Sequence, residues 1–258
     1  MKANYHTHTA RCKHASGSER EYVKHAIDHG FSILGFSDHV PQPYPDNFTS
    51  GIRMSMDELP EYVDTLIKLR DEYRDRIEIL IGFEVEYTHK YFDKLINILS
   101  DYPIDYIILG QHYVPDEIDG FYVGAATSDE SKLKAYADFT IEAMKTGLFT
   151  YPAHPDLINY TGDHLTYLKH MERIVATAID LNLPLEINMY GFLDKRNYPR
   201  NLFFKMASDM GASFIIGCDA HRPDIVLQPN ELAGFAEFLK RNNITYGDNT
   251  VQLRSIHA

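Results

Sequence analysis

The chain begins Met1-Lys-Ala-Asn-Tyr-His-Thr-His-Thr-Ala-Arg-Cys-Lys-His14, and this stretch decides how the later strands are interpreted. Residues two apart in a strand point to the same face, so His6 and His8 can direct both imidazoles to one point. Neutral imidazole is a common ligand of transition metals, and His14 follows closely. The stretch therefore predicts a first strand that leads into a metal site, although a solvated His-rich segment would contain the same residues.

Apolar runs and helical patterns alternate along the rest of the chain. The residues 18–30 predict a helix, because Ser18 can cap it, Glu21 follows three residues later and Gly30 can end it. More helices are predicted over 55–76, 91–100, 128–145, 163–181 and 230–241, with another after a basic loop that contains Lys195, Arg196 and Arg200. After the N-terminal strand, the apolar runs that predict strands are 33–39, 77–84, 105–112, 148–154, 184–188 and 212–221.

This order predicts an α/β fold with one parallel sheet covered by helices. Seven strand–helix units favour a closed, TIM-barrel-like (β/α)7 barrel over a doubly wound open sheet. An open sheet would normally carry a glycine-rich phosphate-binding turn after its first strand, and the sequence contains neither common form of that motif.

Six of the seven predicted strands end in residues that can bind a metal, namely His6 and His8, His39, Glu84, His112, His154, and Asp219 with His221. The carboxyl ends of barrel strands meet at one face, so we expect these side chains to share a pocket with His14. Nine ligands exceed the requirement of one ion, which is about four for zinc and up to about six for other divalent metals. The pattern therefore predicts two to three ions of zinc, iron or manganese, with Glu84 or Asp219 as a bridging carboxylate.

The composition places the chain among ordinary globular proteins, with 44% hydrophobic and 24% charged residues. Lys and Arg number 25 and Asp and Glu 37, and the net charge of −12 argues against nucleic-acid binding. Two cysteines are too few for a disulfide framework. Neither a signal-peptide core nor an apolar run of about eighteen residues is present. We expect one catalytic domain over 1–258 in the cytoplasm, without nucleic-acid or membrane partners, and the sequence contains no signal for the oligomeric state.

Several of these motifs together resemble the polymerase-and-histidinol-phosphatase (PHP) family: Tyr5-His-Thr-His-Thr9 with His14, Gly35-Phe-Ser-Asp-His39, Glu84 after a strand, and Cys218-Asp-Ala-His221. The similarity extends from residue 4 to about residue 223, and the chain looks most like the stand-alone histidinol-phosphate phosphatases of the family. The resemblance implies a distorted seven-stranded barrel with a trinuclear metal site at the carboxyl ends of its strands. The implied ligand sets are His6, His8, Glu84 and Asp219 for one ion, Glu84, His112 and His154 for the second, and His14, His39 and His221 for the third.

The implied function is metal-dependent hydrolysis of L-histidinol phosphate, a small-molecule phosphate ester of histidine biosynthesis. One part departs from the family pattern, because the segment 154–160 lacks the basic residue that often follows the fifth-strand histidine. Arg196 and Arg222 are the candidates for the missing phosphate contact, since a guanidinium suits phosphate oxygens, and Arg53 is a third. Asp156 or a water molecule is the candidate acid for the leaving alkoxide.

Other functions remain open at this point. The same chemistry could serve a nucleotide or another small phosphate ester. A module attached to a DNA polymerase is a second alternative, which the acidic charge and the lack of a further domain argue against. An amidohydrolase also places a His-x-His pair on its first strand, but it usually adds a lysine at a strand end, and no predicted strand ends in lysine.

Overall fold

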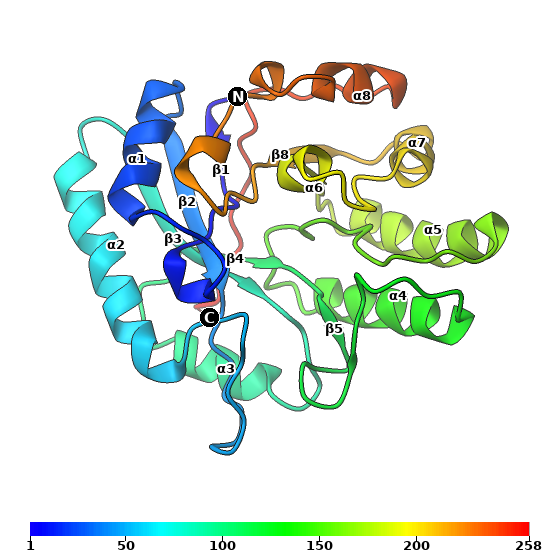
Figure 1. Cartoon of the computed structure of the whole chain (residues 1–258), viewed down its shortest axis with the longest axis horizontal. Coiled ribbons are helices and arrows are strands. Elements are labelled where there is room, and N and C mark those ends of the chain that lie inside the picture. The colour runs from blue at the N-terminus through cyan, green and yellow to red at the C-terminus, as the bar shows by residue number, and fades with distance from the viewer. Residues whose placement is uncertain (258) are drawn as a thin grey trace.

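The computed structural model describes residues 1–257, and its elements follow the predicted alternation. The parallel strands are β1 (Ala3–Asn4), β2 (Ile33–His39), β3 (Glu78–Val85), β4 (Tyr106–Leu109), β7 (Leu185–Asn188) and β8 (Phe214–Gly217). The helices are α1 (Glu19–Asp28), α2 (Leu59–Tyr73), α3 (Phe92–Leu99), α4 (Glu130–Lys145), α5 (His164–Asp180), α6 (Met189–Leu193), α7 (Asn201–Asp209) and α8 (Phe235–Arg241). Figure 1 shows the longer helices around the outside of the strands.

The strands form two parallel groups. The first has the order β1-β2-β3-β4, and in the second β7 pairs with β8. The register of β2 and β3 places His39 directly beside Glu84. Because both strands run in the same direction, the predicted ligands at their carboxyl ends lie together at one edge. The fold is α/β with a curled parallel sheet, as predicted.

Backbone hydrogen bonds connect the two groups of strands. Leu109 N donates to Tyr151 O at 3.0 Å, and Glu186 N donates to Pro152 O at 3.2 Å. On the other side, Thr7 and Ala220 form a parallel bridge. The strand predicted over 148–154 is therefore only an extended segment with one bridge, at Pro152. Proline explains the difference, because it has no N–H to donate to a regular ladder.

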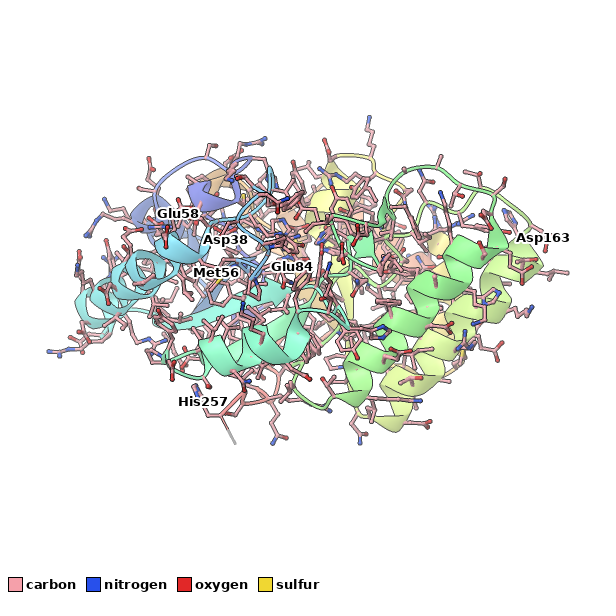
Figure 2. All side chains as sticks on the ribbon, turned by 90° about the horizontal axis from the view of Figure 1, so that it is seen from below. Asp38, Met56, Glu58, Glu84, Asp163 and His257 are labelled. Atoms are coloured by element: carbon pink, nitrogen blue, oxygen red, sulfur yellow. The ribbon has the colours of Figure 1, made fainter. Side chains whose placement is uncertain are left out.

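Side chains alternate between the inner face of the curled sheet and the outer face under the helices. Tyr106 fills the inner face where Gly35 and Gly82 leave room, since a Cβ on either glycine would overlap its side chain. Its hydroxyl donates to Tyr5 O at 2.6 Å. Glu84 lies two residues beyond Gly82 on the same face of β3, so its carboxylate stands at the carboxyl-end side of this aromatic floor. Figure 2 shows Glu84 in the interior and Asp163, the N-cap of α5, at the periphery.

Some helix signals in the sequence are confirmed and others shift. Ser18 and Glu21 form the predicted capping box, and α2 starts at Leu59 just before Pro60. The predicted helix over 230–241 is reduced to α8, because Gly234 adopts a φ of +80° and interrupts it. Within residues 1–257, none of the helices is long and apolar enough to span a bilayer.

Two segments without a predicted helix or strand contain regular structure. The segment 113–128, which lies between the strand predicted over 105–112 and the helix predicted over 128–145, begins with an antiparallel hairpin of β5 (Tyr113–Val114) and β6 (Phe121–Tyr122). The predicted basic loop begins with α6, because the Asn188 side chain caps this helix by accepting from Gly191 N at 2.7 Å. Both elements follow directly after strands that carry or precede candidate ligands, so they become walls of the site.

The buried side chain of Asn249 joins β8 to β1. Its Oδ1 accepts from Ile216 N at 2.8 Å, and its Nδ2 donates to Ile216 O and Ala3 O, each at 2.9 Å. Asn249→Ala would leave these backbone groups without that partner, so we expect the free energy of unfolding to fall by about 3 kcal/mol, measured by urea denaturation.

The matched control for this prediction is Asn243→Ala. Asn243 also has a positive φ, 55° against 65° for Asn249, but it is exposed. Equal losses in the two variants would show that backbone conformation, and not the carboxamide hydrogen bonds, accounts for the effect.

Candidate metal centre

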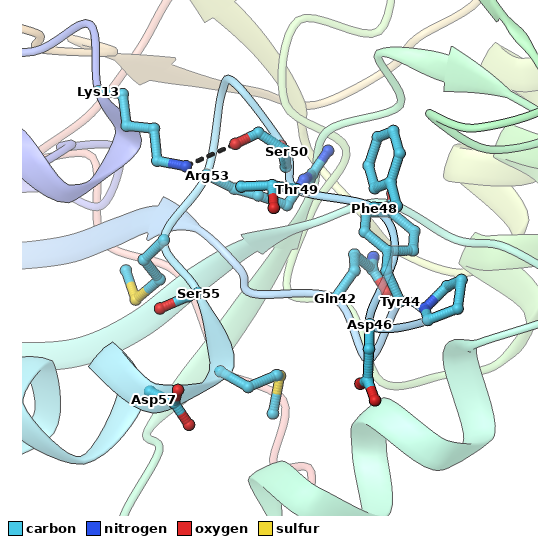
Figure 3. A pocket seen from close by; sticks show the side chains of 13 residues that line it. Lys13, Gln42, Tyr44, Asp46, Phe48, Thr49, Ser50, Arg53, Ser55 and Asp57 are labelled. Carbon is cyan, nitrogen blue, oxygen red and sulfur yellow. Dashed lines mark hydrogen bonds between the residues drawn. The ribbon is translucent and has the colours of Figure 1, made fainter.

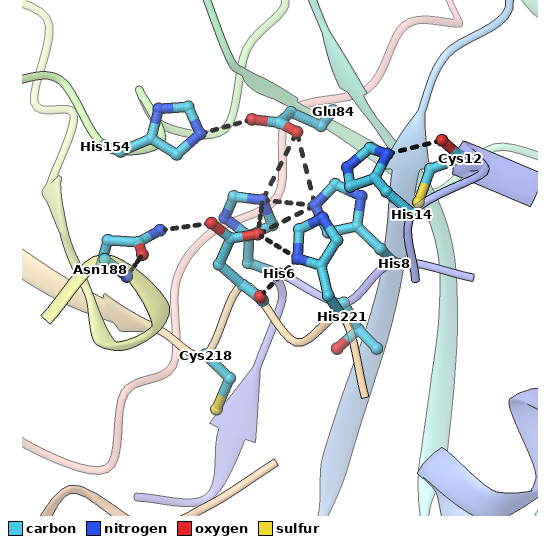
Figure 4. A network of polar contacts seen from close by, with 12 residues as sticks. His6, His8, Cys12, His14, Glu84, His154, Asn188, Cys218 and His221 are labelled. Carbon is cyan, nitrogen blue, oxygen red and sulfur yellow. Dashed lines mark hydrogen bonds and ion pairs between the residues drawn. The ribbon is translucent and has the colours of Figure 1, made fainter. Parts of the chain in front are cut away.

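The nine predicted ligands converge at the carboxyl ends of the strands. All are buried except His14, which is exposed, and His112, which is half-buried. Figure 4 shows His6, His8, Glu84 and His221 directed toward one another. The His8 and His221 rings stack with centroids 4.1 Å apart, and those of His14 and His221 lie 4.7 Å apart. The geometric part of the prediction, that these distant residues meet, agrees with the structure.

Glu84 lies at the middle of the group, with imidazoles on both sides of its carboxylate. Its Oε1 is 2.7 Å from His154 Nε2 and 3.6 Å from His112 Nε2. Its Oε2 is 3.0 Å from His39 Nδ1 and 3.5 Å from His8 Nε2. Although Oε2 is buried, none of these nitrogens meets it with hydrogen-bond geometry. A buried carboxylate oxygen surrounded by ring nitrogens but without a hydrogen bond fits a metal ligand.

Asp219 closes the opposite side of the group. Its Oδ1 lies 3.0 Å from His8 Nε2 and 3.5 Å from His6 Nε2, and these two ring nitrogens are 3.2 Å apart. Asn188 Nδ2 donates to the other oxygen, Oδ2, at 3.1 Å. The amide thus holds the carboxylate so that Oδ1 faces the two histidines.

The groups of side chains that could hold an ion, with ligand atoms within 4.8 Å of one another, overlap the implied ligand sets. They include His6, His8 and Asp219; His14, His39 and His221; His8, His39 and Glu84; and His6, Glu84 and His154. A further group adds the thiol of Cys12 to His8 and His221. One of these groups is identical to the third implied ligand set, and another contains three of the four residues of the first set. The second is present as two contacts of Glu84 Oε1, with His112 and with His154.

Three carboxylates that the sequence analysis did not single out lie beside the imidazoles. Glu186 Oε1 lies 2.7 Å from His6 Nδ1, and Glu86 Oε1 lies 3.1 Å from His112 Nδ1. Asp38 Oδ1 is 3.4 Å from His8 Nδ1. The contacts of Glu186 and Glu86 are hydrogen bonds that occupy Nδ1 and leave Nε2 directed at the centre, which is the arrangement by which outer carboxylates set the tautomer of metal-binding histidines. Asp38 approaches His8 without a hydrogen bond to its Nδ1. Two features of the sequence could have indicated these carboxylates: Glu186 interrupts an apolar strand, and Glu86 lies two residues after Glu84.

Charges in the site favour ionised carboxylates. Burial alone would raise the pKa of Glu84, but the surrounding histidines, above all His112 and His39, outweigh it and hold the pKa well below its usual value. Burial likewise opposes protonation of His6, yet Glu186 and Asp219 outweigh it and raise its pKa to about 10. Burial holds the pKa of His39 well below its usual value. A bound cation would replace the proton on His6, because metal ligands must be deprotonated.

Two candidate ligands have unusual backbone conformations. His154 has a φ of 30° and Asp219 a φ of 50°, in the left-handed region that side chains with a Cβ rarely adopt. Conformations of this kind concentrate where a functional geometry requires them. With these backbone conformations, the His154 side chain is directed toward Glu84 and the Asp219 side chain toward His8.

Two glycines leave the space that the carboxylates occupy. A Cβ on Gly110 would overlap Glu84 Oε1, and a Cβ on Gly217 would overlap Glu186 Oε1. Both glycines lie on strand ends beside the carboxylate concerned. The positions of Glu84 and Glu186 therefore depend on the absence of side chains at 110 and 217.

The group opens into a pocket of about 270 Å³. Its lining comprises His14, His39, Gly51, Ile52, Glu84, His112, Tyr113, Tyr122, Arg196, Tyr198, Asp219 and His221. Arg196 is the guanidinium in this lining. Its Nε donates to Asp194 at 2.9 Å, its Nη1 to the Tyr198 hydroxyl at 3.3 Å, and the group lies 4.8 Å above the Tyr190 ring. These contacts hold Arg196 in the pocket lining beside the candidate ligands, and one of its amino groups takes part in none of the hydrogen bonds.

The other predicted phosphate or acid residues lie elsewhere. Arg222 is exposed and pairs with Asp224. Arg53 is buried between Glu86 and Glu117, which neutralise its charge. Asp156 is buried outside the pocket lining and accepts from Arg200 N at 2.5 Å, and burial raises its pKa to about 7. Of the three arginines considered from sequence, only Arg196 lines the pocket.

Comparison with known proteins gives consistent relatives. The PHP domain model matches residues 4–190. The chain is 31% identical over 231 residues to the protein named "Probable histidinol-phosphatase" of Deinococcus radiodurans, covering 84% of this chain and 85% of the relative. It is also 31% identical over 122 residues to the histidinol-phosphatase of Bacillus subtilis, covering 44% of this chain and 45% of that protein.

A solved structure shares the fold. The histidinol phosphate phosphatase of Lactococcus lactis, crystallised with zinc, L-histidinol and phosphate, superposes with a TM-score of 0.72 at 20% identity, covering 97% of this chain and 98% of that one. This similarity bears on the fold alone. The match of the family model over most of the chain and the identity to the Deinococcus radiodurans relative show that this chain belongs to the PHP domain family.

Proposed function

We propose that the chain is a metal-dependent phosphomonoesterase that hydrolyses L-histidinol phosphate with water to L-histidinol and inorganic phosphate. The observation that carries the proposal is the largely buried group of seven histidines, Asp219 and the central Glu84, which opens into a pocket lined also by Arg196. The relatives named as histidinol-phosphatases support the choice of substrate.

The proposal includes two to three divalent ions of zinc, iron or manganese, held by the nine residues in the implied sets. Such ions would supply positive charge to the phosphoryl oxygens and lower the pKa of a water molecule. It also includes a distorted (β/α)7 barrel in one catalytic domain over 1–258, with the extended segment 149–153 as the fifth strand and the metal site at the carboxyl ends. The hydrogen bonds from Leu109 to Tyr151 and from Glu186 to Pro152 support this arrangement.

The chain's own residues then have separate tasks. Glu186 and Glu86 fix the tautomers of His6 and His112, so that Nε2 of each is available in the centre. Arg196 donates to a phosphoryl oxygen, and Tyr190 and Asp194 hold its guanidinium in place. Burial would lower the pKa of Arg196, but Tyr198 and Asp194 outweigh it, so the group stays cationic.

A substrate panel tests the function. Histidinol phosphate should be hydrolysed with a kcat/KM at least about tenfold above that of any nucleoside monophosphate, a difference of about 1.4 kcal/mol in transition-state binding. The measurement is phosphate release by metal-analysed protein under one set of conditions. A nucleoside monophosphate that ranks first would replace histidinol phosphate with a nucleotide as the substrate while leaving the phosphoesterase chemistry in place.

A further inference from the structure

The lining of the catalytic pocket combines two chemically different sets of residues. One set comprises the candidate ligands and Arg196, which suit a phosphoryl group. The other set comprises Ile52, Tyr113 and Tyr122, which we name the aromatic wall. Tyr122 is 41% exposed and lies in the lining of the pocket, so its ring is accessible to a bound molecule. Because the Tyr122 ring is exposed beside the candidate ligands, it could contact a bound substrate.

The two tyrosines form one continuous surface. Tyr113 on β5 and Tyr122 on β6 are cross-strand partners in the hairpin, and their ring centroids lie 5.5 Å apart at an angle of 46°. Tyr113 directly follows the candidate ligand His112, and Val123 N donates to His112 O at 2.8 Å. The position of both rings relative to the metal group is therefore set by short backbone connections.

The hairpin is fastened to the loop that carries Ile52. Glu117, between β5 and β6, accepts from Arg53 Nε at 2.9 Å and from Ser50 Oγ at 2.7 Å. Arg53 is 1% exposed and also lies 3.2 Å from Glu86, the carboxylate that orients His112. These contacts connect the hairpin of Tyr113 and Tyr122 and the loop of Ile52 to Glu86. The aromatic wall is therefore organised before a substrate binds.

The segment 50–53 separates two spaces. Ser50 and Arg53 line a second, polar cavity with Gln42 and Tyr44 (Figure 3). Gly51 and Ile52 line the catalytic pocket. The side chains of Ser50 and Arg53, at the two ends of this segment, are both held by Glu117. Ile52 therefore faces the substrate pocket on a supported segment.

We propose that the aromatic wall binds the ring of the leaving alcohol and thereby selects phosphate esters whose alcohol half carries a planar ring. The inference rests on the proposed function, because it takes the phosphoryl group to lie between the candidate ligands and Arg196. An ester bound in that way directs its alcohol half to the remaining side of the pocket. Tyrosine rings attract planar rings by offset stacking or edge-to-face contact, and they attract a protonated imidazole more strongly by cation–π contact.

The test compares two substrates in each variant. The readout is the ratio of kcat/KM for histidinol phosphate to kcat/KM for phosphoethanolamine, an amino-alcohol ester without a ring. Tyr122→Ala should lower this ratio by about tenfold. Tyr113→Ala should lower it in the same direction, whereas Tyr122→Phe, which keeps the ring, should leave it within about threefold of the wild type. Tyr246→Ala is the matched control, since Tyr246 is 36% exposed and lies outside the pocket.

The outcomes separate the two proposals. If Tyr122→Ala leaves the ratio unchanged, or lowers kcat/KM for both esters equally, the aromatic wall does not select the ring. If the wild type fails to prefer histidinol phosphate, the proposed function fails, and 2-phenylethyl phosphate in the same panel then tests the wall alone. A wild-type preference for that ester over phosphoethanolamine that Tyr122→Ala abolishes would support the wall, and indifference to both rings would overturn it.

Discussion

Glu84→Ala is expected to remove up to two metal ions per chain and to lower kcat for phosphate-ester hydrolysis by at least about a thousandfold. Its two carboxylate oxygens face different imidazoles, His154 on one side and His39 and His8 on the other. If Glu84 binds two ions as proposed, loss of the carboxylate would leave both ions short of a ligand and remove a negative charge that they share. The measurements are elemental analysis and steady-state kinetics, against a wild type that should carry two to three ions.

His39→Ala is the comparison for this variant. His39 groups with His14 and His221 and also with His8 and Glu84, but it offers one imidazole to one ion. In the implied ligand sets that ion is the third, so loss of His39 should cost about one ion and leave the pair at Glu84 largely occupied. Circular dichroism and a melting curve must show that both variants fold, because loss of metal also reduces stability. Folded variants that lose equal numbers of ions would contradict the bridging role of Glu84.

Arg196→Ala is expected to lower kcat/KM by about a hundredfold while the metal content stays normal. Arg196 supplies the arginine side chain of the pocket lining, and a charge-assisted contact to a phosphoryl oxygen strengthens as charge develops in the transition state. Steady-state kinetics with a saturating metal supplement measures kcat/KM. Elemental analysis of the same preparation measures the metal content. Arg196→Lys should restore part of the activity, because it returns the charge without the planar fork.

Arg222→Ala is the matched control for Arg196, since Arg222 also follows a candidate ligand in sequence but is exposed and paired with Asp224. It should stay within about threefold of the wild type, in the range of ordinary surface substitutions. Full activity in Arg196→Ala would mean that the phosphoryl group is held without a guanidinium. A large loss in Arg222→Ala would mean that this exposed side chain turns into the pocket when substrate binds.

The convergence of the ligands could be predicted because it depends on strand direction. Apolar runs set where β2 and β3 end, and parallel pairing then places His39 beside Glu84 whatever the loops do. The apolar residues of 148–154 predict a strand, and this segment hydrogen-bonds to β4 on both sides of Pro152, although it forms one bridge and no regular ladder. The carboxylates behind the histidines were missed, since Glu186 meets His6 only through tertiary packing across 180 residues.

The direction of an arginine side chain could not be predicted from its distance to a ligand in sequence. Arg222 adjoins His221 but turns to solvent, where Asp224 satisfies it. Arg53 was considered for phosphate, but two glutamates from separate segments neutralise it. In each case the competing partner is a carboxylate whose position depends on how a loop folds, and loop conformation is not encoded by strand periodicity.

Gly110 and Gly217 bear on how such a centre can be lost over generations. Neither glycine contributes a functional atom, yet a single methyl group at either position would occupy the place of a carboxylate oxygen. A duplicated gene could thus retain every histidine and acid of the centre, keep its fold and still encode an inactive copy through one glycine-to-alanine change. Inventories of ligand residues would count such a copy as an enzyme, and inspection of positions 110 and 217 would distinguish it.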